Sequence, residues 1–205
     1  QADVWAEGGT VRAVLVDGAR IAVAALRWDA VAGRYVPDGK PVRFTTEAGI
    51  ETATIARDGR SRWWIAYPQN GRMWVRASPN GAEWSQPYEV SHLPASSDDL
   101  CAIVALPGGV GVVWSDQAHD AVFFRRHPDT ADIGRWDPVE VVEQGGGNAD
   151  DHLNAAIAPD GTLYVAGKNS VDTVGRAQLV LRVRDPRGRW TSYPYAVRTT
   201  QDEPS

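Results

Sequence analysis

The 205-residue sequence has little cysteine, no long apolar run and no excess of positive charge. Cys101 is the only cysteine, which excludes an intramolecular disulfide and a cysteine-rich zinc site. No apolar stretch approaches the roughly 20 residues that a membrane-spanning helix needs. The formal net charge is −5. Because acidic and basic residues are interspersed, we expect neither a nucleic-acid partner nor a membrane partner.

Motifs of several common enzyme classes are also absent. The sequence has no glycine-rich phosphate-binding loop, no nucleophile elbow and no HExxH zinc motif, which argues against those chemistries. It is instead rich in tryptophan, glycine and proline, with 9, 20 and 13 residues respectively. This composition is typical of short strands joined by tight turns, and no helix pattern of convincing length is present. The sequence therefore predicts an all-β protein.

One pattern recurs along the chain. Its clearest copy, Val75–Trp84, reads as the end of a strand, a polar turn containing glycine and an aromatic residue. A short β-prone run follows each copy. The copies end at Tyr35, Trp84, Trp136 and Trp190. A spacing of about 50 residues between copies predicts a repeat architecture.

Turn signals divide each repeat into short strands. Asp17-Gly18 and Asn70-Gly71 are strong hairpin signals, and Asp58-Gly59 and Asp160-Gly161 mark further turns. The resulting plan has four repeats, at about 1–48, 49–97, 98–149 and 150–198. Four-stranded antiparallel units at this spacing predict a β-propeller, since each sheet can bury its faces only against neighbouring blades.

The first repeat departs from this plan. Its strands are expected at Val11–Val16, Arg20–Arg27 and Pro41–Phe44, whereas Gln1–Gly9 is too polar and glycine-rich to predict an innermost strand. The last repeat runs into the polar segment Thr199–Ser205. We therefore expect an incomplete ring, finished by further blades of a six- or seven-bladed parent or by a second chain. A four-bladed ring with one short blade is the alternative.

The recurring motif resembles the Asp-box, or BNR, repeat of sialidase-like propellers, which runs roughly Ser-x-Asp-x-Gly-x-x-Trp. Ser78–Trp84 is the best match, with Asn80 in place of Asp and glycine one position early, and Asp185–Trp190 is a shortened relative. The resemblance implies a structural turn between the third and fourth strands of a blade, and it identifies no catalytic residue. The segments Asp150–Asn154 and Lys168–Ser170 also resemble a stretch in secreted bacterial BNR-like proteins.

Two more specific assignments fit the sequence less well. Sialidase catalysis needs arginines that converge on the substrate carboxylate, but the recurring arginines lie on third strands of different blades: Arg27, Arg76, Arg125 and Arg182. This argues against sialidase activity. Trp28-Asp29 and Trp136-Asp137 are literal WD pairs, yet no Gly-His pair precedes either, so a WD-repeat propeller is the weaker alternative.

Acidic residues gather where innermost strands are expected to begin, at the mouth of the central channel. Alignment of the repeats places Asp98 and Asp99 opposite Asp150 and Asp151, and Glu51 lies near the corresponding place in the second repeat. In the simplest structural interpretation, these acids accept backbone hydrogen bonds in turns.

The same residues also suit ligand binding or catalysis. With His152 and Asn154 they could bind sugar hydroxyls, and Asp98, Asp150 and Asp151 could coordinate a hard cation such as Ca²⁺. Asp150, Asp151 and His152 could instead divide into a general acid and a general base. The sequence leaves these alternatives open.

A second polar set follows the second strands of the third and fourth repeats. It comprises Trp114, Asp116, Gln117, His119, Lys168, Asn169, Ser170 and Asp172. Loops at one end of the blades suit ligand recognition, and Tyr67 or Trp114 could stack on a sugar ring. The polar members suit solvated loops equally well.

Three functions are consistent with these patterns. The first is carbohydrate recognition by an extracellular or periplasmic propeller, with a glycan partner at the channel mouth. The second is a polysaccharide-degrading enzyme, either a glycoside hydrolase or a lyase, and the third is a protein-interaction scaffold. We expect no obligatory cofactor, although Ca²⁺ is compatible with the acidic cluster. Cys101 is predicted to be a buried, unreactive thiol in an inner strand.

Overall fold

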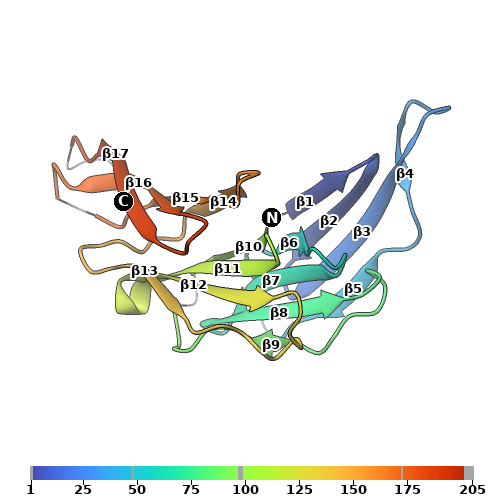
Figure 1. Ribbon diagram of the computed structural model, residues 1–205, viewed down its shortest axis with the longest axis horizontal. Helices are drawn as coiled ribbons and strands as arrows, with labels where there is room; N and C mark the ends of the chain where they lie inside the picture. The colour runs from blue at the N-terminus through green and yellow to red at the C-terminus, as the bar shows by residue number, and fades with distance from the viewer. Residues whose placement is uncertain (1, 48, 97–98, 172, 201–205) are drawn as a thin grey trace.

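The computed structural model describes residues 2–47, 49–96, 99–171 and 173–200, which form four antiparallel sheets (Figure 1). We call these sheets blades 1 to 4 in chain order. Within the described ranges the one helical element is the 3-10 turn η1 (Gln117–His119). No helix in these ranges is long and apolar enough to cross a membrane.

Each blade is an antiparallel meander of consecutive strands, to which blade 1 adds a fifth strand that pairs with its third. Blade 1 contains β1 (Ala2–Glu7), β2 (Thr10–Asp17), β3 (Arg20–Asp29), β4 (Arg34–Pro37) and β5 (Val42–Thr45). Blade 2 contains β6 (Thr54–Arg57), β7 (Trp63–Gln69), β8 (Arg72–Ser78) and β9 (Tyr88–Glu89). Blade 3 contains β10 (Cys101–Leu106), β11 (Gly109–Asp116), β12 (Ala121–Pro128) and β13 (Glu140–Gln144). Blade 4 contains β14 (Leu153–Ile157), β15 (Leu163–Lys168), β16 (Ala177–Arg184) and β17 (Trp190–Val197).

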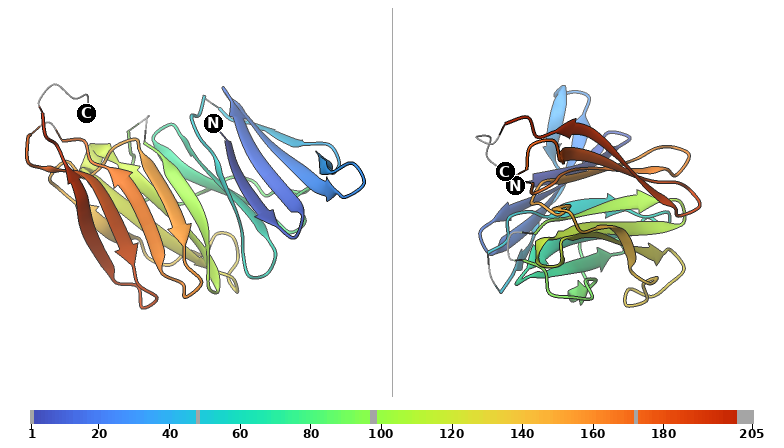
Figure 2. Two further views of the ribbon diagram at one scale, coloured as in Figure 1. Left: turned by 90° about the horizontal axis from the view of Figure 1, so that it is seen from above. Right: turned by 90° about the vertical axis from the view of Figure 1, so that its left-hand side faces the viewer.

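The first strand of every blade lies innermost. Strand β1 contacts β6, β6 contacts β10, and β10 contacts β14, so that the four sheets fan around a common axis (Figure 2). The predicted β-propeller architecture is therefore confirmed. The four blades form an open arc and not a closed ring.

The prediction that the first repeat lacks its innermost strand is wrong. Ala2–Glu7 forms β1, which pairs antiparallel with β2, and Gly8 and Gly9 make the connecting turn with positive φ angles. The segment is polar on only one face, because Asp3 alternates with apolar Ala2 and Val4. The arc is thus open although blade 1 has an inner strand. A further strand, β4, was not predicted, and it shares β3 with β5.

The hairpin predicted at Asn70-Gly71 is confirmed in detail. Both residues have positive φ angles, 54° and 66°, and they join Gln69 to Arg72 as a two-residue loop between β7 and β8. A type I′ turn needs positive φ at both central residues, and Asn-Gly meets that need at the lowest steric cost. The local sequence therefore sets the register of blade 2.

The apolar cores lie between blades. One core joins blades 1 and 2, a second joins blades 2 and 3, and a third joins blades 3 and 4. In the motif turn of blade 2, Ser78 accepts a hydrogen bond from the Gly81 backbone, and Asn80 accepts bonds from Ala82 and Glu83. The turn directs Trp84 onto the preceding blade, against the ring of Phe44.

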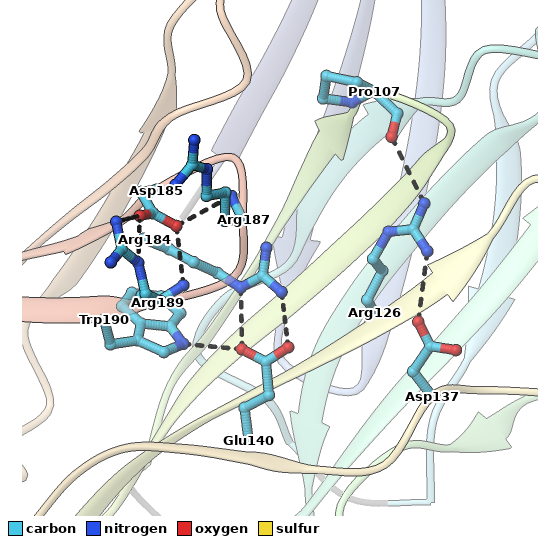
Figure 3. A network of polar contacts seen from close by, with 9 residues as sticks. All are labelled: Pro107, Arg126, Asp137, Glu140, Arg184, Asp185, Arg187, Arg189 and Trp190. Atoms are coloured by element: carbon cyan, nitrogen blue, oxygen red, sulfur yellow. Dashed lines mark hydrogen bonds and ion pairs between the residues drawn. The ribbon is translucent and has the colours of Figure 1, made fainter.

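A polar network at one end of the sheets links blades 3 and 4 (Figure 3). The Glu140 carboxylate accepts two hydrogen bonds from the Arg184 guanidinium, at 2.9 and 2.7 Å, and one from the Trp190 indole at 2.8 Å. Asp185 accepts backbone hydrogen bonds from Arg187 and Arg189 in the adjacent turn. The bonds of Glu140 to Arg184 and Trp190 therefore hold blade 4 against blade 3.

Candidate ligand-binding cleft

A cleft of about 590 Å³ opens where the innermost strands begin. Asp151, His152 and Asn154 line it from the start of β14, and Lys168 from the end of β15. Residues just before β6 and β10 also reach it, so three blades contribute to its walls. Of the polar residues that the sequence placed at this end of the channel, the cleft is lined by Glu51, Asp151, His152, Asn154 and Lys168.

Four charged side chains form a cluster at one wall of the cleft. The Nδ1 atom of His152 lies 2.9 Å from Oδ1 of Asp150 and 2.5 Å from Oδ1 of Asp151. The ammonium group of Lys168 lies 3.4 Å from the other oxygen of Asp150. Asp150 is 6% exposed, whereas His152 is open to solvent. Asp150 is therefore a buried residue that orients His152 and Lys168 at the wall of the cleft.

The cluster shifts the pKa values of its members. Burial alone raises the pKa of Asp150, but hydrogen bonds with Asp151 and His152 and the charge of Lys168 outweigh burial, so that its pKa lies below the ordinary value. The hydrogen bond to Asp150 raises the pKa of His152, and the negative charge of Asp151 adds to the effect. The lowered pKa of Asp150 and the raised pKa of His152 have the same cause, because a protonated imidazole and the carboxylates beside it stabilise each other.

The geometry does not fit Asp150 and Asp151 as a pair of glycosidase carboxylates. Such pairs flank the scissile bond at about 5 to 5.5 Å in retaining enzymes and at about 6.5 to 9.5 Å in inverting ones. Here an oxygen of each carboxylate and the His152 nitrogen lie within 4.8 Å of one another. The His152 imidazole contacts both carboxylates, and Asp150 is buried, so the two acids do not face each other across an open cleft.

The same cluster supplies few ligands for calcium. Ca²⁺ takes six to eight oxygen ligands, but within the described residues this group offers two carboxylates and one histidine. Lys168 already neutralises Asp150 at 3.4 Å. Asp98, the third predicted metal ligand, lies outside the described residues. The calcium hypothesis is therefore an untested prediction that this donor set does not favour.

Three other predicted ligand-binding residues are buried in internal hydrogen bonds. Asp99 accepts bonds from the backbone of Ser96 and Gln117, and burial raises its pKa. Asp116 caps η1 and contacts His119. Asn169 accepts a bond of 2.7 Å from Arg182 and donates one to the carbonyl of Ala177. Asp99 thus has the turn-stabilising role of the simplest interpretation, whereas Asp116 and Asn169 are buried and do not lie in solvated loops. None of the three lines the cleft.

The stacking role suggested for Trp114 and Tyr67 is wrong. Both side chains are 1% exposed and belong to the apolar cores between blades. Trp114 packs against Phe123 in the next strand of its own blade. Both faces of β11 are buried, so apolar and polar side chains do not alternate clearly along this strand. The sequence therefore could not show that Trp114 points inward.

Tyr195 is the aromatic residue that the sequence reasoning missed. It lies in β17, is 59% exposed and lines the cleft together with Asn154 and Lys168. The pairing of β16 with β17 shifts register between Ala177 and Val180, next to this position. Such an irregularity changes the direction in which nearby side chains point. The sequence contains no signal for it beyond the close spacing of Tyr193 and Tyr195.

Comparison with solved structures agrees with the fold. An α-L-arabinanase of Penicillium chrysogenum, complexed with arabinobiose, aligns with a TM-score of 0.62 at 12% identity, over 98% of this chain and 66% of that chain. A fungal lectin of Aleuria aurantia, described as a six-bladed β-propeller with a novel mode of fucose recognition, aligns with a TM-score of 0.61 at 14% identity. The alignment covers 100% of this chain and 62% of the lectin.

A xylan β-1,4-xylosidase from Bacillus halodurans aligns with a TM-score of 0.56 at 10% identity, over 95% of this chain and 41% of that chain. No protein-family model and no curated protein matches the sequence. At these identities the likeness establishes the fold class, a β-propeller. The chain spans less than two thirds of the length of the arabinanase and of the lectin.

Proposed function

We propose that this chain recognises a glycan outside the cytoplasm, in the cleft where the innermost strands begin. The observation that carries the proposal is the combination of an exposed aromatic ring, Tyr195, with Asn154, Asp151 and Lys168 around one cleft. An aromatic ring offers an apolar surface for a sugar ring, and the polar side chains offer both donors and acceptors for hydroxyl groups. Similarity in fold to a fucose-recognising lectin and to an arabinobiose-bound arabinanase supports this assignment.

The charge of the cleft favours a neutral or amino sugar over a strongly acidic one. The positive charges of His152 and Lys168 are already directed at Asp150 and Asp151. Glu51 adds a further negative charge to the lining. A uronate would bring its carboxylate toward a wall whose cations are already paired.

Calorimetric titration with a panel of neutral, amino and acidic oligosaccharides tests the proposal. We expect Tyr195→Ala to weaken binding at least tenfold, because it removes the aromatic surface, and Asn154→Ala to weaken it less. Tyr193→Ala is the matched control, since Tyr193 lies two residues away in the same strand, is equally exposed and does not line the cleft. Equal losses for both tyrosine variants would contradict the assignment of this cleft.

Glycan cleavage by a hydrolase or a lyase is the second candidate function. Glu51 and Asp151 line the same cleft from different blades, so they could lie on opposite sides of a bound sugar chain. The raised pKa of His152 would keep a proton donor beside Asp151. Release of reducing ends, or of unsaturated products that absorb in the ultraviolet, would reveal either reaction. Glu51→Gln and Asp151→Asn should each abolish cleavage, and the Tyr195-dependent binding should persist in Glu51→Gln.

A further inference from the structure

Three arginines occupy equivalent places on the third strands of blades 2, 3 and 4. Each side chain reaches back to the preceding blade and contacts a residue in its outermost strand or next to that strand. The three are Arg76 in β8, Arg125 in β12 and Arg182 in β16. The interfaces between blades can therefore be compared at one position.

The residues that these arginines contact are equivalent as well. Phe44, Val90 and Glu143 each pair with the second residue of the third strand in their own blade. The same place in the fold thus holds an aromatic ring in blade 1, a backbone carbonyl in blade 2 and a carboxylate in blade 3. What each arginine binds is set by the residue at this place.

In two of the three interfaces the chain itself supplies oxygen acceptors to the arginine. Arg182 is 1% exposed and pairs with the Glu143 carboxylate at 2.6 Å. Arg125 donates hydrogen bonds of 3.1 and 2.8 Å to the carbonyls of Val90 and Asp137. A guanidinium at this position is therefore suited to a carboxylate or carbonyl oxygen in front of it.

The interface between blades 1 and 2 leaves its arginine without such a group. The Arg76 guanidinium lies over the Phe44 ring, 5.0 Å from the ring centroid, and donates one bond of 2.7 Å to the Ser85 carbonyl. Its Nε atom is buried, and among the described residues it has no hydrogen-bond partner. A buried donor without an acceptor is costly, so an oxygen acceptor from outside the chain would be stabilised here.

A pocket of about 320 Å³ opens beside Arg76, between blades 1 and 2. Ligand pockets hold roughly 300 to 1,000 Å³, so this one suits a single small ring. The indole of Trp74 packs partly into the core between the two blades and donates a bond of 3.3 Å to the Gln69 carbonyl. Polar side chains complete the lining, among them Thr45, Glu47, Gln69 and Gln86.

We propose that this pocket binds an acidic monosaccharide unit, a uronate, whose carboxylate lies against Arg76. The parallel N–H groups of a guanidinium match a carboxylate, and Glu143 shows that the equivalent position accepts one. The Trp74 ring offers an apolar surface to the sugar, and Gln69 and Gln86 offer partners for its hydroxyl groups.

This pocket is a second site, separate from the cleft at the start of the innermost strands. The two share no lining residue, and their charge favours different ligands. In the cleft the cations are paired with Asp150 and Asp151, whereas Arg76 has no ion pair among the described residues. Glu47, the acid of the pocket lining, is exposed, and solvent screens its charge.

NMR titration of the full chain, labelled with nitrogen-15, tests the proposal. The probes are D-galacturonate and D-glucuronate, with D-galactose as the neutral match, and the signals are the Trp74 indole N–H and the Arg76 Nε–H. We expect saturable shifts with a uronate and at least tenfold weaker binding of galactose. Arg76→Gln should weaken uronate binding at least tenfold, because it removes the charge and the paired donors.

Two control variants separate this site from the rest of the chain. Arg43→Gln removes an exposed arginine of β5 that does not line the pocket, so it should bind the uronate like wild type. Tyr195→Ala alters the cleft alone and should leave the uronate titration unchanged. Failure of the cleft and failure of this pocket are thus distinguishable.

A further variant covers the case in which Arg76→Gln does not fold, as judged by the dispersion of the other indole signals. Gln86→Glu places a carboxylate at an exposed position of the lining, so it should weaken uronate binding at least threefold. The absence of saturable shifts with both uronates, or equal affinity for galactose, would overturn the proposal. Equal affinity for sodium acetate would also overturn it, because it would show an anion site without recognition of the sugar.

Discussion

At the scale of single residues, Asp150 organises the candidate cleft although it is almost inaccessible itself. It contacts His152 and Lys168 with different oxygens, and both cations reach the cleft lining. Removing one partner of a buried ion pair leaves an uncompensated charge, which is more costly than the pair is favourable. Asp150 is therefore a positioning residue, and its substitution should affect the cleft through His152 and Lys168.

The first prediction concerns the pH dependence of His152. Its pKa is raised in the folded chain, so its contribution to stability is present below its unfolded pKa, roughly 6.5, and is lost as pH rises through the folded value. Asp150→Asn should lower the folded pKa toward 6.5, as measured by NMR titration of the imidazole. His92 is the internal control, because burial lowers its pKa and it should not respond. An unchanged His152 titration would contradict the role of Asp150.

The second prediction concerns Cys101, whose predicted burial is confirmed. Its side chain is 2% exposed, and burial raises the pKa of the thiol. Since the thiolate is the reactive form, we expect a thiol reagent to label the native chain far more slowly than the denatured chain. Rapid labelling under native conditions would show that β10 opens locally.

At the scale of elements, the motif turns connect each blade to the one before it. The polar residues of a turn bond its own backbone, as Asn80 does, while the aromatic residue after the turn enters the neighbouring core. The strands themselves are short, and a small sheet cannot bury either face alone. The aromatic residue therefore stabilises the relation between blades more than the fold of any one blade.

The third prediction compares Trp136 with Tyr35, the corresponding aromatic residue of blade 1. Trp136 is 8% exposed and contacts both Trp64 and His127, so Trp136→Ala should cost about 3 to 5 kcal/mol of unfolding free energy. Tyr35→Ala removes a half-exposed ring and should cost about 0.5 kcal/mol or less in dilute solution. Denaturant unfolding measures both values. Similar losses of unfolding free energy in the two variants would mean that the surface of blade 1 around Tyr35 is already covered.

At the scale of the whole molecule, three apolar interfaces hold the four blades in an open arc. The inner strands meet side by side (Figure 1). The cleft draws its walls from blades 2, 3 and 4. Asn154, Ala166 and Leu179 line the cleft and lie on the face of blade 4 that points away from blade 3. The cleft therefore extends onto that face of blade 4.

The amino-acid sequence determines those features of the fold that depend on local interactions. Asn70-Gly71 dictates a type I′ hairpin through backbone sterics alone, and alternating apolar residues indicate strands such as β2 and β8. Repetition of these units then implies blades, because small sheets need neighbours. The meeting of Glu51 with Asp151 and His152 also followed from the repeat plan, since equivalent segments of neighbouring blades lie together.

Only the tertiary structure decided which of these residues a ligand can reach. Trp114 and Tyr195 are both aromatic residues near strand ends, yet one is buried between blades and the other is exposed in the cleft. Asp99 and Asp151 occupy equivalent positions in the sequence repeat. Asp99 accepts hydrogen bonds from backbone N–H groups, whereas Asp151 faces the cleft. The physical reason is that burial and hydrogen-bond partners come from segments distant in sequence. Side chains alternate between the two faces of a strand, but this alternation does not specify which face other segments will cover.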